Sequence, residues 1–154
     1  MNVNKITLLL AELKDHIQHK SVLNEDVSKA SVEWHLSHTI QIFSAICKNA
    51  TQSAPEEYQY AFNKNRFKIW LIGYIPRGIG RSPKAFLNQE ELTEEQLLAF
   101  LNRAEELFED FQKVSKNHFF THPIFGQLNK KRTLWFLHLH TKHHLKIIRD
   151  IIKK

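Results

Sequence analysis

Apolar residues recur at steps of three and four along most of this chain, which is the spacing of one face of an α-helix. The first such stretch includes Ile6, Leu10, Leu13 and Ile17 and predicts a helix over about residues 3–20. The sequence holds only four glycines and four prolines, which are too few for the many turns of a β-sandwich. The pattern therefore predicts an all-α fold.

The same periodicity predicts four more helices, separated by polar or proline-containing breaks. They span about residues 28–49, 57–74, 94–116 and 130–152. Pro76 ends the helix over residues 57–74, because proline lacks an N–H and clashes with the preceding turn. Thr93 and Gln96 predict a capping box at the start of the next one, and Asn129 can cap the last.

The order of these segments predicts one domain over residues 1–154. Short connections favour antiparallel neighbours, so the expected architecture is an up-and-down-like bundle of four main helices with one additional helix. The aromatic residues of the 57–74 segment are interpreted as part of the core. Residues 76–92 are expected to form a long irregular connection, which makes them a candidate lid.

Charge and cysteine content exclude several classes of function. The formal net charge is +6, but the basic residues are spread along the chain, and no nucleic-acid-binding motif is found. No apolar stretch is long enough for a membrane span or a signal peptide, so we expect a cytoplasmic protein without a nucleic-acid or membrane partner. The single cysteine, Cys47, excludes a disulfide framework and is interpreted as a packed core thiol.

The most informative feature is the distribution of the ten histidines. Six fall in two short clusters: His35 and His38, and His138, His140, His143 and His144. His140 and His144 are four residues apart, so a helix places both imidazoles on one face, where they can share a metal ion. His143 lies about a third of a turn away and is a further candidate ligand. The alternative is that each imidazole has its own carboxylate or carbonyl partner.

His38 is the candidate third ligand, since it follows Trp34 by four residues on an apolar stripe of its helix, and His35 is the alternative. Three neutral imidazoles leave a coordination position open, which is the pattern of a catalytic metal site. Zinc or nickel is expected, and iron and copper also suit nitrogen ligands. A water molecule on such an ion would have its pKa lowered toward neutrality.

Two segments, WHLSHT and HTKHHLKIIRD, resemble the DinB/YfiT-like superfamily of metalloenzymes. The segments GYIPRGIGRSPKAF and HPIFGQLNKKRTLWFLHLHTKHHL are similar to its subgroup of bacterial DinB-like domains of unknown function. The resemblance implies a four-helix bundle, often a homodimer, with one metal ligand on the second helix and two on the last. By position these ligands are His38, His140 and His144.

The resemblance also implies a class of reaction. Superfamily members with assigned activities are thiol-dependent transferases or isomerases in which the metal activates the thiol. We therefore expect a metal-dependent enzyme, such as a thiol transferase or a hydrolase, with a small-molecule substrate and a low-molecular-weight thiol. Many members continue after the final histidine with Arg-Gly-Gln, whereas here Leu145, Lys146 and Ile147 follow, so the substrate is not carried over.

Candidate substrate-pocket residues are Trp34, Trp70, Tyr74, Arg77 and Arg81. The two arginines lie among glycines and can bind a carboxylate or a phosphate, although a solvated basic loop has the same composition. The competing hypothesis for the whole chain is a non-catalytic helical bundle that binds a small molecule or a protein partner. In that case the histidines are empty or hold a structural ion.

Overall fold

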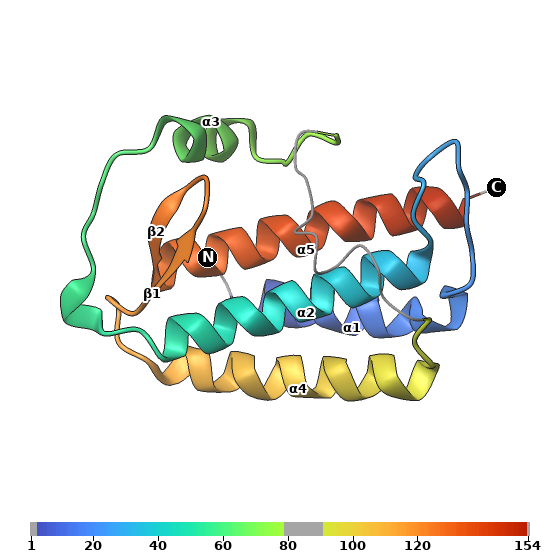
Figure 1. The fold of residues 1–154 in the computed structure, drawn as a ribbon, viewed down its shortest axis with the longest axis horizontal. Coiled ribbons are helices and arrows are strands. Elements are labelled where there is room, and N and C mark those ends of the chain that lie inside the picture. The colour runs from blue at the N-terminus through green and yellow to red at the C-terminus, as the bar shows by residue number, and fades with distance from the viewer. Residues whose placement is uncertain (1–2, 79–90, 154) are drawn as a thin grey trace.

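A computed structural model of the chain describes residues 3–78 and 91–153, and these residues are mainly helical. The helices are α1 (Val3–Asp15), α2 (Val32–Thr51), α3 (Lys64–Ile72), α4 (Glu94–Lys113) and α5 (Lys130–Ile152), with 3₁₀ turns at Ile17–His19 and Pro55–Glu57 (Figure 1). The expected helical class is found, with the addition of a small hairpin of strands β1 (Phe119–His122) and β2 (Gly126–Asn129). Among the described residues, no helix combines the length and the apolar character needed to cross a membrane.

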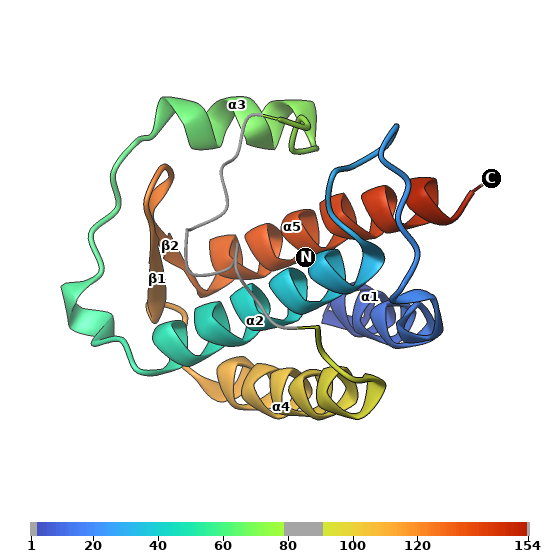
Figure 2. The same ribbon diagram turned by 45° about the vertical axis from the view of Figure 1, so that its right-hand side comes forward.

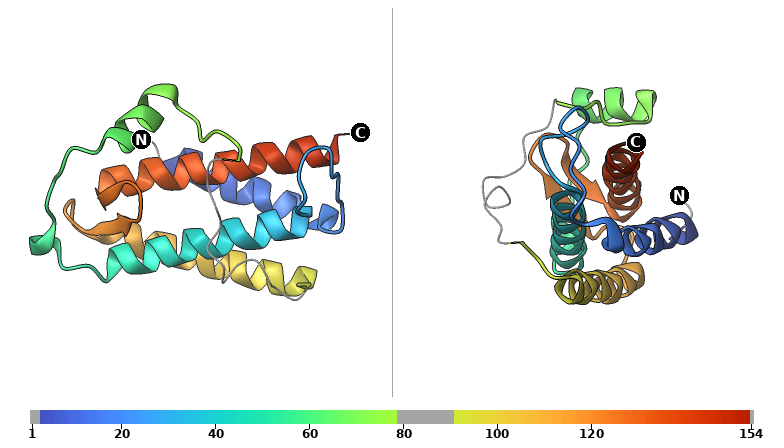
Figure 3. Two further views of the ribbon diagram at one scale, coloured as in Figure 1. Left: turned by 45° about the horizontal axis from the view of Figure 1, so that its top comes forward. Right: turned by 90° about the vertical axis from the view of Figure 1, so that its right-hand side faces the viewer.

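The four long helices α1, α2, α4 and α5 pack around one core, as the end-on view shows (Figure 3, right). Their largest fully buried side chains include Leu10, Leu36, Phe43, Leu101, Phe111, Leu137 and Leu145. In Figure 1, α2 and α4 run in one direction and α1 and α5 in the other. This differs from the up-and-down order expected, because α4 begins at the same end of the molecule as α2.

The helix boundaries follow from side-chain caps. The Ser31 hydroxyl accepts a hydrogen bond from the Trp34 amide at 3.3 Å, so α2 begins at Val32 rather than at residue 28. The predicted capping box is confirmed, since Thr93 and Gln96 each accept a hydrogen bond from the other's backbone N–H.

Two helices end earlier than the periodicity predicts. α1 ends at Asp15 rather than near residue 20, because the chain tightens into the 3₁₀ turn that follows. α4 ends at Lys113 rather than at residue 116.

The prediction of a core helix over residues 57–74 is wrong. Only nine residues are helical: Asn63 caps the Arg66 amide, and Gly73, in the left-handed conformation at φ 72°, ends the helix before Pro76 is reached. The aromatic side chains Tyr60, Phe62, Phe67, Trp70 and Tyr74 are between 48% and 65% exposed. α3 turns Arg66 and Ile69 inward instead, so most of its apolar surface faces outward.

The break predicted between the last two helices folds as an antiparallel hairpin that pairs Phe119 with Asn129. Its turn is closed by His122, whose Nδ1 accepts hydrogen bonds from the amides of Ile124 (3.1 Å) and Phe125 (3.2 Å). The last residue of β2, Asn129, is also the N-cap of α5 and accepts from the Arg132 amide. The hairpin therefore leads directly into the helix that carries the second histidine cluster (Figure 2).

Leu10 and Leu8 allow a matched test of this packing, since both lie on α1 but are 1% and 69% exposed. We expect Leu10→Ala to lower the free energy of unfolding by about 2–5 kcal/mol, because it leaves a cavity in the core. Leu8→Ala should change it by less than about 0.5 kcal/mol. Urea unfolding followed by circular dichroism measures both values. Equal losses in the two variants would contradict the position of α1.

Candidate metal centre

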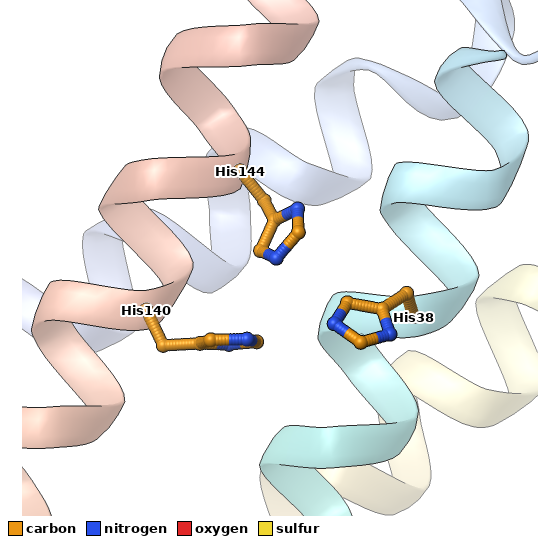
Figure 4. Close-up of side chains that lie close together, drawn as sticks. All are labelled: His38, His140 and His144. Carbon is orange, nitrogen blue, oxygen red and sulfur yellow. The ribbon is translucent and has the colours of Figure 1, made fainter. Parts of the chain in front are cut away.

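Three histidines from two helices that pack against each other converge inside the protein. His38 lies on α2, and His140 and His144 lie one turn apart on α5. One ring nitrogen of each lies within 4.8 Å of those of the other two. The ring centroids of His140 and His144 are 4.7 Å apart, and that of His38 is 4.8 Å from His144 and 5.4 Å from His140. Figure 4 shows the three rings pointing toward one another.

The apolar pattern of α5 explains why its two histidines face inward. Phe136 precedes His140 by four residues and Ile148 follows His144 by four, and both apolar side chains are buried. The helix that carries this stripe packs against α2. His38 reaches the same point from the opposite helix because α2 is buried at consecutive positions along this part of its length.

Burial, nearly complete for His38 and His144 and partial for His140, keeps the three imidazoles neutral. His38 and His144 are 5% and 6% exposed, and the imidazolium form of each would lose most of its hydration. This loss lowers the pKa of His38 to about 4 and that of His140 to about 3, and neighbouring histidines lower the latter further. Burial also places the pKa of His144 well below its usual range. Near pH 7 each ring therefore carries a nitrogen lone pair that can bind a metal.

Trp34 lies directly against the site. Its ring stacks on the imidazole of His38 with a centroid distance of 4.8 Å and an angle of only 5° between the planes. The contact covers one face of that imidazole and holds its plane in position. Trp34, a candidate pocket residue, is thus next to a candidate ligand.

His35, the alternative ligand, faces the same region but has other partners. Its Nδ1 lies 3.0 Å from Nδ1 of His144, and its Nε2 lies 3.0 Å from the hydroxyl oxygen of Ser28. One of the two facing nitrogens must carry the proton, because both rings are neutral. If His144 donates from Nδ1, its Nε2 keeps a free lone pair, and His35 is left to donate from Nε2 to Ser28. His35 is not part of the group of three converging nitrogens.

The remaining candidates are placed differently. His143 lies outside the group of three: its ring is nearly perpendicular to that of His144 at a centroid distance of 5.1 Å, and it hydrogen-bonds to the backbone of Ile75. Arg77 forms an exposed ion pair with Asp150 on α5. Arg81 and most of the candidate lid lie outside the described residues.

Trp70 and Tyr74 are both 61% exposed. Trp70 lines a separate groove in which none of the three converging histidines takes part. The thiol of Cys47 is fully buried, which confirms the prediction of a core cysteine and raises its pKa.

Ser28 is the site residue that the sequence pattern missed. The periodicity placed it inside a helix, whereas it lies in the turn before α2, where its oxygen also accepts a hydrogen bond from the Ala30 amide. Its contact with His35 depends on how this turn folds back over the helix start. Residue spacing in the sequence cannot predict such a contact.

The model of a protein family described as "Protein of unknown function (DUF1569)" matches residues 3–151. No curated protein matches the chain, and no solved structure does.

The histidine pKa values predict how stability depends on pH. His38 and His140 stay neutral in the folded chain down to about pH 4, whereas in the unfolded chain they take up protons near pH 6.5. Between these values the unfolded state binds more protons, so acid favours it. We expect the free energy of unfolding of the metal-free protein to be level above about pH 7 and to fall as the pH falls from about 6.5 to about 4.

Urea titrations across this range measure the effect. The variant His38→Phe/His140→Phe should show a weaker dependence, because it lacks two of the responsible groups. A free energy of unfolding that rises on acidification would contradict the burial of these rings.

Proposed function

Since the chain belongs to the DUF1569 family, whose function is unknown, we propose a function from the site itself: the protein binds a divalent metal ion through His38, His140 and His144. The observation that carries the proposal is the approach of three ring nitrogens to within 4.8 Å of one another. Neutral imidazoles suit zinc and nickel, the metals that we propose, and they suit iron and copper as well. A common ion also supplies the polar partner that buried imidazoles need.

We further propose that the protein is a metal-dependent enzyme of the thiol-transferase type. A divalent metal held by three histidines lowers the pKa of a water or thiol in the position left open. The chain itself offers no suitable thiol, because its single cysteine is buried and has a raised pKa. The thiol would therefore come from a low-molecular-weight cosubstrate.

The surrounding side chains would prepare the ligands for this role. Trp34 keeps water from one face of His38 through its stacked ring. His35 and Ser28 orient His144 and are compatible with the tautomer in which Nε2 of His144 is free. A site arranged in this way loses little conformational freedom when it binds a ligand.

We also propose that the family is a branch of the DinB-like superfamily, with the four long helices as its bundle. The arrangement of the ligands supports this, with one histidine on the second long helix and two on the last. On the same basis we propose a small-molecule substrate and a homodimer.

The first test is metal content. His140→Ala should abolish stoichiometric metal binding but leave the helical circular dichroism signal largely unchanged, because it removes a ligand and little packing. His138→Ala is the matched control, since it lies on the same helix outside the converging group. Elemental analysis of protein purified without a histidine tag gives the metal per chain. Full occupancy in His140→Ala would show that the ligands are assigned wrongly.

An activity assay distinguishes an enzyme from a non-catalytic helical bundle. We expect the metal-loaded protein to join the sulfur of a low-molecular-weight thiol to the ring carbon of a chlorinated aromatic substrate, with release of chloride and a proton. A chelator should stop the reaction. Loaded protein that retains its metal but accelerates no such reaction would favour a structural ion in a non-catalytic bundle.

A third test concerns His35. His35→Leu should weaken metal affinity by about 10- to 100-fold while the stoichiometry stays at one, because it removes the partner that orients His144. Ser28→Ala should act in the same direction with a smaller effect, and His35→Gln should restore part of the affinity by accepting from His144. Loss of all binding in His35→Leu, as in His140→Ala, would identify His35 as a ligand instead.

A further inference from the structure

A groove separate from the histidine cluster lies between α3 and the start of α5. Its volume is about 640 Å³, which is within the usual size range of small-molecule sites. In Figures 1 and 2, α3 lies opposite the first turns of α5 and the hairpin. None of the histidines proposed as metal ligands lines the groove, so it is distinct from the metal centre.

Aromatic rings come from five of its ten lining residues. They belong to Tyr60, Phe62, Phe67, Trp70 and Trp135. Phe67 and Trp70 are stacked at 6.0 Å with an angle of 29° between their planes. Four of the five rings are at least 48% exposed, which is unusual for a cluster of large apolar side chains on a soluble surface. A flat apolar ligand would remove this surface from water.

The charged groups of the groove all have one sign. Arg66, Lys131 and Arg132 line it, and no Asp or Glu does. Within residues 3–78 and 91–153, none of the ion pairs formed includes these three cations. Their positive charge is therefore not balanced by a carboxylate, and an anion would be attracted to it.

Two of these cations are held in place. Arg66 is only 8% exposed and donates to the backbone carbonyls of Ala61 and Phe125. Arg132 donates to the Tyr58 hydroxyl at 3.0 Å and lies 4.7 Å above the ring of Tyr60. These contacts fix the positive charge beside the aromatic walls before any ligand binds.

We propose that this groove binds a small organic anion with a flat, aromatic body, such as an aromatic carboxylate or sulfonate. The rings of Trp70 and Trp135 would contact the apolar body, and Lys131 and Arg132 would pair with the acidic group. The site requires no metal, so it stands independently of the proposed function.

A pair of fluorescent probes tests the proposal. The aromatic sulfonate 8-anilino-1-naphthalenesulfonate carries one negative charge, and N-phenyl-1-naphthylamine has the same rings without it. We expect the sulfonate to bind once per chain and to quench tryptophan fluorescence, with an affinity at least about tenfold above that of the neutral probe. Equal affinities would overturn the role of the positive charge.

Variants then locate the bound probe. Lys131→Gln and Arg132→Gln should each weaken binding of the sulfonate by about threefold to tenfold and leave the neutral probe unaffected. Trp70→Ala should weaken both probes. The matched controls are Lys113→Gln and Phe100→Ala, which change an exposed lysine and an exposed aromatic residue on α4. Equal effects in controls and groove variants would overturn the assignment.

Three further outcomes complete the test. Unchanged sulfonate binding in His140→Ala supports a site separate from the metal, whereas loss of binding there overturns it. A short single-stranded oligonucleotide and benzoate are compared as competitors of the sulfonate. If the oligonucleotide displaces the sulfonate at the lower concentration, the proposal of a small ligand is overturned in favour of nucleic acid. If neither probe binds and Trp70→Ala converts a dimer to a monomer in sedimentation, the groove is an interface between chains.

Discussion

The burial of neutral imidazoles between α2 and α5 is the constraint on which the site depends. Each ring is surrounded by protein instead of water, which disfavours its charged form. This loss of hydration lowers the pKa of His38 to about 4 and that of His140 to about 3. A core of leucine, isoleucine and phenylalanine side chains between the four long helices supplies that environment. The same packing that stabilises the fold therefore leaves the nitrogen lone pairs available at neutral pH.

The parts of the site that could be predicted from sequence are those that lie on regular helices. On α5 the four-residue spacing of His140 and His144 within an apolar stripe determines both their mutual distance and their inward direction. His38 could be matched to them because α2 is apolar around most of its circumference and so had to be central. Residue spacing could not decide whether His38 or His35 is the third candidate ligand, since both side chains face α5.

The prediction from sequence failed where the apolar pattern does not correspond to burial in the core. The aromatic residues around α3 have helical spacing, yet Arg66 points inward and Trp70 outward. The Arg66 guanidinium donates to the backbone carbonyl of Phe125 in the hairpin turn and to that of Ala61 before α3. The hairpin itself was missed because its strands have only four residues each and their alternation is weak. Ser28 lay in a turn, where contacts depend on the path of the chain rather than on a repeat.

The junction at Asn129, where β2 passes into α5 without an intervening loop, determines the rotational phase of the last helix. Each residue of an α-helix advances the side-chain direction by about 100°. One residue inserted between Asn129 and His140 would turn either the cap or both imidazoles away from their partners. An insertion at the hairpin tip would leave that phase intact. Insertions and deletions in natural relatives should therefore be tolerated at the hairpin tip and be absent between Asn129 and His140.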